Sequence, residues 1–370
     1  MKGWRECKLG DIASFSYGMM PKKEKIGYGK YPTFSGYKYQ YLYPEYNCEP
    51  GDLIVVARGV GGTGDVKIVK EKCYLTNLSI KIDTNKLLLN NKYFYYANAI
   101  ETLRYLDSGS AQSQITINDL VRIIISVPPL HEQKAIASVL SSLDDKIDLL
   151  HRQNKTLEAM GETLFRQWFV EEAEEGWEED SLLNLIQLIG GGTPKTSVAE
   201  YWDGNISWLA GGDITSNHKS FVHNTEKTIT ENGLKNSSAK LLPKYATVIS
   251  ARGTVGKYCL LAQPMAFSQS NYGILPRVEN CYFFTYLLIN HAVEELQASA
   301  YGSVFDTITT TTFKEHKVHI PSESEIRFFE ETVALYFYKI FNNKIQIRTL
   351  EKLRDTLLSK LMNGDVRVVE

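Results

Sequence analysis

Three glycines, Gly59, Gly61 and Gly64, satisfy the spacing G-x-G-x-x-G within the segment VVARGVGGTG, and Asp83 follows about twenty positions later. This pattern is typical of a turn that receives a dinucleotide pyrophosphate, with the acidic group on the ribose. An NAD(P)-dependent oxidoreductase is therefore one hypothesis for the chain. Such a site needs a helix directly after the glycines. The residues that follow, DVKIVKEKCYLTNLSIKI, favour strands instead.

No other catalytic or metal pattern accompanies the glycines in the sequence. The seven histidines show no HExxH spacing, and the five cysteines stand far apart without a CxxC. The segment GTVGKY, from Gly253, is too short for a phosphate loop. Isolated cysteines fit free thiols in a reducing cytosol. We therefore expect a cytoplasmic protein that is not an enzyme and that holds no metal or cofactor of its own.

The composition indicates a soluble protein of two or three domains. The chain has 370 residues, of which 43% are hydrophobic, and no apolar run approaches the roughly 18 residues of a membrane span. The net charge is −2. Residues 1–130, however, carry 17 Lys and Arg against 12 Asp and Glu, whereas residues 131–175 carry 5 against 10. The basic first third permits phosphate contacts without requiring them.

The chain repeats itself at an offset of 193 residues. The segment GSAQSQITINDLVRIIISVPPLHEQK, from Gly109, aligns without a gap with GSVFDTITTTTFKEHKVHIPSESEIR, from Gly302. The register continues for about 55 residues in all. Further upstream, the Ala-Arg-Gly at Ala57 recurs at Ala251, and Trp4 has a counterpart in Trp177. The order is therefore globule, helix, globule, helix.

Each helical segment carries a heptad pattern of the coiled-coil type. The predicted seam includes Leu143, Ile147, Leu150, Leu157 and Leu164 in the first segment, and Tyr336, Ile340, Ile347, Leu350 and Leu357 in the second. Two repeats related by a pseudo-twofold axis would set these helices antiparallel. We interpret the polar seam positions Asn154, Asn343 and Arg354 as register devices. An ordinary helical hairpin is the alternative.

The globular segments are predicted to be β-rich, with short helices. DLIVVARG and ATVISARG indicate strands that end in a turn, while KYFYYANAIETLRYL and YFFTYLLINHAVEELQASA predict one helix each. Tyrosines interleaved with lysines from Tyr28 to Tyr46 suit either a recognition surface or cross-strand pairs. We predict an α+β protein with globules at 1–130 and 176–321, and helical segments at 131–175 and 322–370.

The chain resembles the specificity subunit of Type I restriction–modification systems. PPLHEQKAIASVLSSLDDKIDLL is similar to the central conserved region of that family, and IPSESEIRFFEETVALYFYKIFNNKI to its C-terminal region. GGTPKTSVAEYWDGNISWLAGGDI, from Gly191, resembles the opening of many of its target-recognition domains. Two departures stand out. Ile326 replaces the glutamine that follows the glutamate in the family motif, and the first globule lacks the GGTP…YWDG opening.

The resemblance implies a non-catalytic DNA-binding subunit. Each globule would be a target-recognition domain that reads one half of a bipartite, asymmetric site on double-stranded DNA. The helices would fix the gap and dock methyltransferase subunits, two per chain, and restriction–motor subunits would join through that core. S-adenosylmethionine, ATP and magnesium would belong to those partners. The alternatives are a DNA-recognition partner of another type of restriction–methylation enzyme, the oxidoreductase, and a structural coiled-coil scaffold.

The matched turns at Arg58 and Arg252 come first among the candidate DNA contacts, because a guanidinium can pair with a guanine edge or a phosphate. The competing interpretation is that each arginine braces its own turn through backbone carbonyls. The further candidates are Tyr37, Lys38, Tyr39, Asn77, Ser110 and Gln112 in the first globule, and Thr193, Lys195, Trp208, Thr254, Lys257, Gln269, Asn271 and Ser303 in the second.

Overall fold

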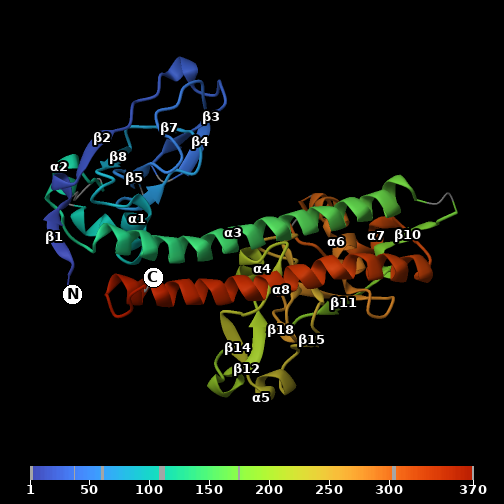
Figure 1. The fold of residues 1–370 in the computed structure, drawn as a ribbon. Helices are drawn as coiled ribbons and strands as arrows, with labels where there is room; N and C mark the ends of the chain where they lie inside the picture. Colours follow the sequence, from blue (N-terminus) through green and yellow to red (C-terminus); the bar gives the residue numbers. More distant parts are fainter. Residues whose placement is uncertain are drawn as a thin grey trace. The chain divides into compact units, whose positions relative to one another are not determined.

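The computed structural model describes residues 3–36, 38–59, 62–107, 113–173, 176–301 and 306–368 (Figure 1). The chain divides into two compact units. The first consists of Met1–Asp148 and Arg348–Glu370, and the second of Leu149–Ile347. Each unit thus holds one globule together with a segment of each long helix. No helix within the described ranges is long and apolar enough to cross a membrane.

The globule of the first unit is built from two small sheets and a strand pair. The inner sheet has the antiparallel order β2-β8-β5-β6, and the outer sheet has the order β4-β3-β7, with β3 parallel to β7. The strand bounds are β1 Arg5–Lys8, β2 Ala13–Tyr17, β3 Tyr31–Ser35, β4 Lys38–Tyr43, β5 Leu53–Val56, β6 Val66–Ile68, β7 Tyr74–Leu75, β8 Ser79–Thr84 and β9 Ile124–Val127. The helices are α1 Asn91–Ile100 and α2 Ile117–Arg122, with short 3-10 turns at η1 Leu9–Asp11, η2 Lys23–Lys25 and η3 Leu103–Leu106.

The globule of the second unit has the same plan with one more strand in each sheet. Its sheets have the orders β11-β19-β16-β17-β13 and β14-β12-β18-β15. The strand bounds are β10 Glu179–Ser181, β11 Ile186–Gly190, β12 Trp202–Leu209, β13 Phe221–Val222, β14 Lys227–Ile229, β15 Leu241–Leu242, β16 Thr247–Ser250, β17 Tyr258–Leu261, β18 Met265–Phe267, β19 Asn271–Pro276 and β20 Lys317–His319. The helices are α4 Gly211–Ser216, α5 Glu231–Lys235, α6 Tyr282–Tyr301 and α7 Thr310–Glu315, with 3-10 turns at η5 Leu182–Asn184 and η6 Ala199–Tyr201.

The predicted repeat is confirmed in three dimensions. Helices α2 and α7 lie 193 residues apart at both ends, and the strands β9 and β20 that follow them pair with the first strand of their own globule. Thr116 and Thr309 cap the two helices through the same side-chain bond to the residue three positions on. The segments that align in sequence therefore fold alike in the two halves of the chain. One predicted helix is shorter than expected: α1 ends at Ile100, and η3 follows.

The two long helices are α3 (Leu130–Arg166), which continues as a π-helical turn to Glu171, and α8 (Glu323–Met362). Within the second unit Asn154 lies opposite Asn343, and Phe165 contacts Phe329. Residue numbers thus rise along α3 as they fall along α8. The same holds within the first unit, where Asp144 pairs with Arg354 and Ile136 packs in one cluster with Leu361. The antiparallel prediction is confirmed in each unit.

Every residue of the predicted seam is buried or half-buried. The buried members are Ile147, Leu150, Ile340 and Ile347, and the half-buried ones are Leu143, Leu157, Leu164, Tyr336, Leu350 and Leu357. At three places the following residue is the more buried one, namely Phe165, Phe337 and Leu358. An α-helix of 3.6 residues per turn drifts against a strict heptad, and this displacement is what such drift produces.

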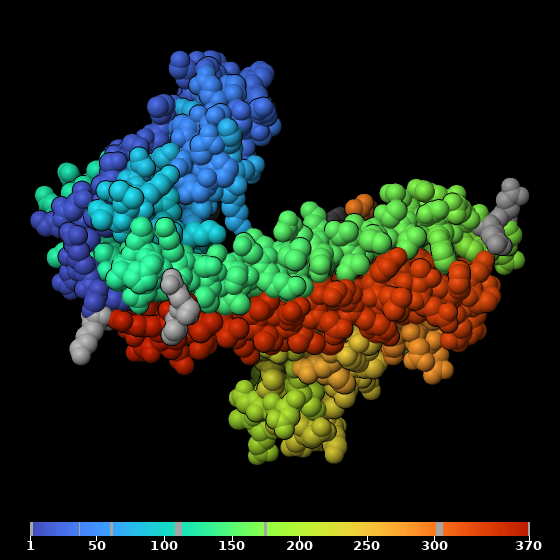
Figure 2. All heavy atoms as spheres, viewed as in Figure 1, coloured from blue at the N-terminus to red at the C-terminus, as the bar shows by residue number. Residues whose placement is uncertain are grey.

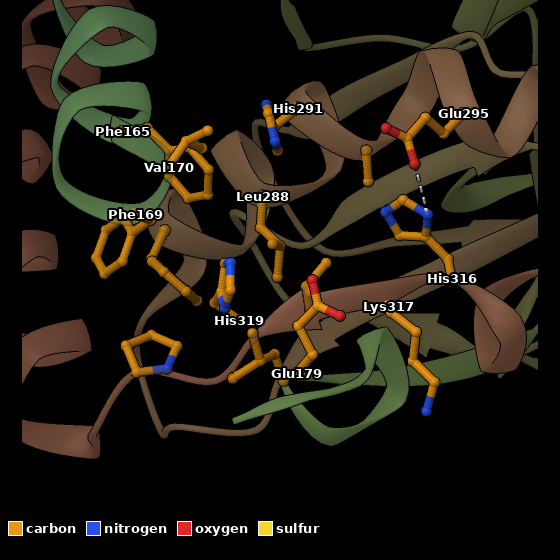
Figure 3. Close-up of a pocket in the computed structure, with 15 residues that line it drawn as sticks. Phe165, Phe169, Val170, Glu179, Leu288, His291, Glu295, His316, Lys317 and His319 are labelled. Atoms are coloured by element: carbon orange, nitrogen blue, oxygen red, sulfur yellow. Dashed lines mark ion pairs between the residues drawn. The ribbon is translucent and has the colours of Figure 1, made fainter. Parts of the chain in front are cut away.

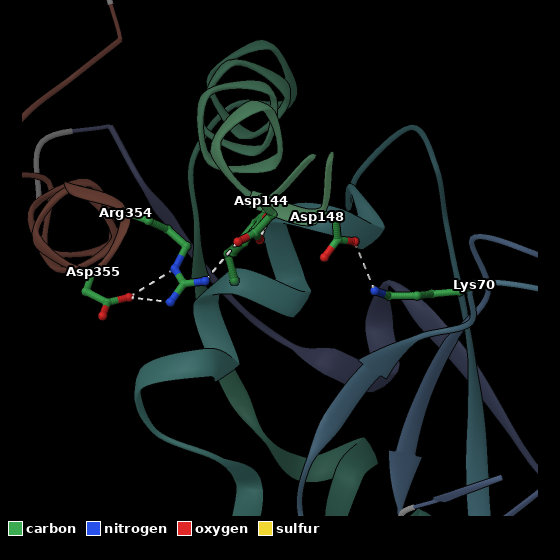
Figure 4. A network of polar contacts seen from close by, with 6 residues as sticks. Lys70, Asp144, Asp148, Arg354 and Asp355 are labelled. Carbon is green, nitrogen blue, oxygen red and sulfur yellow. Dashed lines mark hydrogen bonds and ion pairs between the residues drawn. The ribbon is translucent and has the colours of Figure 1, made fainter. Parts of the chain in front are cut away.

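The polar seam residues pair with polar partners on the opposite helix. In the second unit the Asn343 side-chain amide donates to Asn154 Oδ1 at 2.8 Å, and both residues are buried. In the first unit Arg354 Nη1 donates to Asp144 Oδ1 at 2.9 Å and also binds Asp355 (Figure 4). Burial lowers the pKa of Arg354, but the two carboxylates together outweigh burial and raise this pKa above its ordinary value. Nearby, Lys70 of the globule binds Asp148 of α3 at 3.3 Å.

Each globule is joined to its long helix at the N-terminus of α1 or α6, but by different residues. In the first unit the buried Gln133 accepts from Asn90 N and donates to the carbonyls of Leu88 and Pro128. Ile326 stands at the matching position of the second unit, buried in the core.

Glu330, one helical turn further along α8, takes over the bonding role in the second unit. Its carboxylate accepts from Phe283 N and Phe284 N, at the start of α6. Burial raises the pKa of Glu330 to about 7, although these backbone bonds lower it. The hydrogen bonds that Gln133 makes between the long helix and the first globule are thus made by Glu330 in the second unit. The substitution at Ile326 lies in the core and removes no exposed contact.

Candidate nucleic-acid interface

The two Ala-Arg-Gly turns occupy the same place in their globules. Each follows an inner strand, β5 or β16. The carbonyl of Ala57 accepts from Ile115 N at 2.9 Å, and that of Ala251 accepts from Ile308 N at 3.1 Å. Arg58 and Arg252 come next in the chain and are exposed. Both turns are therefore fixed by a bond from the segment just before α2 or α7.

Neither arginine braces its own turn through a residue that the structure describes. Among the described residues, the guanidinium groups of Arg58 and Arg252 make no hydrogen bond and no ion pair. A guanidinium without a protein partner is available to a phosphate or to a base edge. This finding removes the bracing interpretation for the described part of the chain.

The glycines around Gly59 do not form a dinucleotide site. The strand β6 begins at Val66, directly after the turn, where such a site requires a helix. Gly64 has a positive φ of 92°, and a Cβ there would lie 2.4 Å from the backbone nitrogen of Arg104. Gly64 is thus required by a close approach between chain segments. Gly61 lies outside the described residues.

Three loops of the first globule meet at the turn between β7 and β8, which spans Thr76–Leu78. Gly18 N donates to Ser79 O at 3.1 Å, and Arg58 N donates to Leu78 O at 3.1 Å. The Ser79 hydroxyl donates to the carbonyl of Gly36, in the loop between β3 and β4. This turn therefore gathers the ends of β2, β3 and β5 around the half-buried Asn77.

The second globule builds the same assembly at the turn between β18 and β19, which spans Ser268–Ser270. Gly192 N donates to Phe267 O, Ala251 N donates to Ser270 O, and Ser268 N donates to Leu209 O. Gln269 stands where Asn77 stands in the first globule and is exposed. Its amide oxygen accepts from the hydroxyl of Thr193. We call these two assemblies the recognition clusters.

Trp208 and Asn271 lie inside the second globule. Trp208 is 7% exposed, and its indole N–H donates to the carbonyl of Gly192 at 3.0 Å. Asn271 is 1% exposed, and its amide donates to Ser268 Oγ at 2.9 Å. A duplex cannot reach either side chain in this conformation. Both residues support the second recognition cluster from within, and the surface considered for DNA excludes them.

The remaining candidates lie at or near the clusters. Lys38 is exposed at the start of β4, and the half-exposed Tyr39 packs edge-to-face on Phe34. Lys195 is exposed, and Thr254 shares hydroxyl bonds with Ser250 and Thr215. Tyr37, Ser110, Gln112 and Ser303 lie outside the described residues.

A polar cavity of about 520 Å³ lies beside the second turn. Its lining includes Lys257, Lys219, His218 and Arg166, together with Glu162. Burial and the two lysines lower the pKa of His218, which keeps this imidazole neutral at pH 7. A second carboxylate, Glu294, also lines the cavity, and Lys219 pairs with Glu162 at 3.9 Å. Lys257 places the cavity next to the Arg252 turn.

The structure also gathers histidines that are far apart in the sequence. His291, His316 and His319 line a cavity of about 140 Å³ between α3, α6 and β20 (Figure 3). His316 Nδ1 lies 3.4 Å from Glu295 Oε2, and burial lowers the pKa of His316. Within the described ranges, no three His, Cys, Asp or Glu side chains are placed to hold a metal ion. Aromatic rings such as Phe165 and Phe169 form the rest of the wall.

A family model described as the Type I restriction modification DNA specificity domain matches residues 1–159 and 174–357. The chain belongs to this family. The Type I restriction enzyme HindI specificity subunit of Haemophilus influenzae is 24% identical over 76% of each chain. The MjaIX specificity subunit of Methanocaldococcus jannaschii is 25% identical over 76% of this chain and 70% of its own.

The fold of this specificity subunit matches a solved one. The crystal structure of the S subunit from M. genitalium superposes with a TM-score of 0.72 and 20% identity, and it covers 97% of this chain and 96% of its own. The prediction of two recognition domains with two long conserved helices is therefore confirmed. The oxidoreductase alternative has no support in the family, in the relatives or in the glycine turn.

Sequence reasoning missed one part of the first recognition domain. Its opening loop, Gly18–Lys22, was treated as unlike that of the second domain. Gly18 and Gly191 nevertheless precede the same spacing, G-x-x-P-K, which ends at Lys22 and Lys195. This signal lies at an offset of 173 residues, the offset that also relates Trp4 to Trp177. The offset differs from 193 because the second domain has more residues between its opening loop and its Ala-Arg-Gly turn than the first domain has.

Proposed function

We propose that this specificity subunit directs a Type I restriction–modification complex to a bipartite, asymmetric site on double-stranded DNA. Each recognition domain reads one half of the site through its recognition cluster. The single observation that carries this proposal is the matched presentation of Arg58 and Arg252, exposed and without a described protein partner, on turns fixed by the same backbone bonds.

The chemistry of the clusters suits sequence readout. An arginine can bind the O6 and N7 atoms of guanine, and an amide such as Asn77 or Gln269 can bind adenine. Exposed lysines beside them can neutralise phosphates and so fix the register on the duplex. The subunit itself performs no reaction in this proposal.

The long helices act as the spacer and as the docking surface. Two methyltransferase subunits bind along α3 and α8, and restriction–motor subunits join through them. S-adenosylmethionine is held by the methyltransferase, and ATP and magnesium by the motor. The target base is extruded from the duplex by the methyltransferase, because chemistry on a base requires it to leave the stack. The assembly works in the cytoplasm, where the DNA is.

Methylome sequencing of the host with and without this gene tests the proposal. We expect the loss of one two-part methylation motif with a fixed gap. An unchanged methylome, with the partner subunits expressed, would contradict it. Exchange of residues 1–130 for another first domain should change one half of the motif, and a change in both halves would contradict the modular assignment. A motif without a fixed gap would favour a partner of another type of restriction–methylation enzyme.

A further inference from the structure

The opening loops of the two recognition domains are equivalent in their backbone. Gly18 follows β2 and Gly191 follows β11, and the two strands pair in the same register with β8 and β19. Met19 N donates to Leu75 O at 2.9 Å, and Gly192 N donates to Phe267 O at 2.9 Å. Met20 therefore stands where Thr193 stands in the second domain, and Lys22 stands where Lys195 stands.

Both loops are held against their clusters and are not free arms. A Cβ on Gly18 would lie 2.3 Å from the carbonyl oxygen of Thr76, and a Cβ on Gly191 would lie 2.2 Å from that of Ser268. Only glycine permits this approach. In the first domain, the bonds to Leu75 and Ser79 lie on either side of Asn77, so the loop crosses the turn beside that amide.

This fixed loop exposes two large apolar side chains. Met19 is 63% exposed and Met20 is 72% exposed. Figure 2 shows in blue the outer lobe of the first domain, which contains β3 and β4. Lys22 and Lys23 follow directly and are exposed, while Lys25 is paired with Glu45. Double-stranded DNA carries apolar thymine methyl groups between rows of phosphates. Apolar side chains next to lysines are complementary to such a surface.

The two recognition clusters differ in chemistry at the position of Met20 in the first domain and Thr193 in the second. In the second domain Thr193 and Gln269 are joined by a hydrogen bond, which orients the amide. In the first domain Met20 occupies the backbone position of Thr193, and no described residue bonds to the Asn77 side chain. The first cluster thus offers an amide, a guanidinium and an apolar tip, whereas the second offers an amide, a guanidinium and a hydroxyl.

We propose that Met20 is a specificity-determining residue that packs on the 5-methyl group of a thymine in the half-site read by the first domain. The methyl group is the one apolar feature among base edges in the major groove. A polarizable, unbranched thioether fits such a group closely. The inference rests on the proposed function, since it assumes that the first domain reads DNA.

The test is a thymine-to-uracil scan of the half-site that changes when residues 1–130 are exchanged. Uracil lacks only the 5-methyl group. Affinity is measured with duplexes that carry one deoxyuridine at a time, using the complex purified with its partner subunits. We expect one position at which affinity falls about fourfold, the change that corresponds to the burial of one methyl group. A scan that is flat at every position, or a half-site without an A·T pair, would overturn the proposal.

Variants of the loop identify the residue responsible. Met20→Ser, which removes the apolar tip and leaves no methyl group in its place, should bind thymine and uracil duplexes equally, at the level of the wild type on uracil. Met20→Leu should keep the discrimination. Leu42→Ser is the matched control, because Leu42 is also an exposed apolar residue of the first domain but lies on β4 and not in the opening loop. It should leave the discrimination unchanged. Discrimination that survives Met20→Ser would overturn the proposal.

The two levels of inference fail separately. Absence of any two-part methylation motif would contradict the proposed function itself. A normal motif with a flat uracil scan would contradict only the assignment of Met20. Intrusion of the methionine into the minor groove would also give a flat scan, because the thymine methyl group lies in the major groove.

Discussion

The two recognition domains hold their clusters on the same main-chain bonds but are joined to the long helices by different side chains. At the clusters, the turns Thr76–Leu78 and Ser268–Ser270 accept equivalent backbone N–H groups. At the helices, Gln133 serves the first domain and Glu330, one turn further along, serves the second. A repeat can therefore keep a geometry while changing the residue that supplies it.

The largest effect is expected from removing the Glu330 carboxylate, which links α8 to the start of α6 in the second unit. Glu330→Ala leaves the first N–H groups of α6 buried without an acceptor, which should lower the free energy of unfolding by about 3 kcal/mol. Chemical denaturation of the purified chain measures this. Gln133→Ala should cost a similar amount, because Gln133 also makes buried bonds.

Placing the glutamine of the first repeat at the matching position of the second tests whether the two residues have the same role. Ile326→Gln introduced into Glu330→Ala recreates the residue pattern of the first repeat, and we expect it to recover part of the lost stability. Exchange of the exposed Glu331, the neighbour of Glu330, for alanine is the matched control and should change little. Equal losses in the Glu330 and Glu331 variants would refute the assignment of this linking role to Glu330.

The two arginines test whether the clusters act alike. Arg58→Ala and Arg252→Ala should each weaken specific DNA binding by about 2 kcal/mol, with no loss of folding stability. Duplexes with base changes in one half at a time show where each effect falls. Each variant should relax specificity in its own half only. A uniform loss across all sequences would instead indicate that the arginine binds a phosphate.

Stability should depend on pH through Glu330. Its pKa in the folded chain is about 7, above the ordinary value of 4.5, so the folded state binds the extra proton. The resulting stabilisation is full below about pH 4.5 and is lost as the pH rises through 7, by roughly 3 kcal/mol. Glu330→Gln should flatten thermal unfolding profiles over this range.

Glu158 contributes in the same direction, since burial raises its pKa to about 7 as well. Some pH dependence should therefore remain in Glu330→Gln and disappear further when Glu158→Gln is added. A Glu330→Gln variant with the full wild-type slope would show that its carboxyl group does not titrate in this range.

The smallest effect concerns the buried asparagines of the seam in the second unit. Asn154→Leu alone strands the amide of Asn343, which should cost about 1 kcal/mol. The double change to leucine should recover this loss, because both polar groups are then removed. A double-mutant cycle measured by urea unfolding gives the coupling. Thr156→Ala, an exposed change on the same helix, provides the baseline.

The sequence was most informative where one residue type recurred in a fixed register. The 193-residue offset placed α2 against α7 and predicted both long helices, because hydrophobic periodicity follows directly from helix geometry. The matched turns at Arg58 and Arg252 were found in the same way. The predicted heptad seam follows the buried stripe of each helix. Near Phe165 and Leu358 the most buried residue is one position after the predicted one, because the helix does not follow a strict seven-residue period.

Other features could not be predicted because they depend on partners distant in the chain. Burial of Trp208 and Asn271 follows from their positions at the parallel β12–β18 pairing and in the β16–β19 pairing, respectively. The function of Glu330 is hidden in the sequence, since its counterpart in the repeat is Ala137. The equivalence of Met20 and Thr193 could not be predicted, because the two residues differ in type although they occupy the same backbone position in their domains.

The main-chain anchoring of the clusters also bears on how such a protein changes over generations. Backbone N–H and C=O groups are supplied by any residue except proline, whose nitrogen lacks the hydrogen. The tips of the loops at Met20, Arg58 and Asn77 can therefore accept new side chains without a compensating change in the turn that holds them. Under the proposed function, a single substitution at one tip would change the bases read by that domain, while the fold and the half-site read by the other domain would stay unchanged.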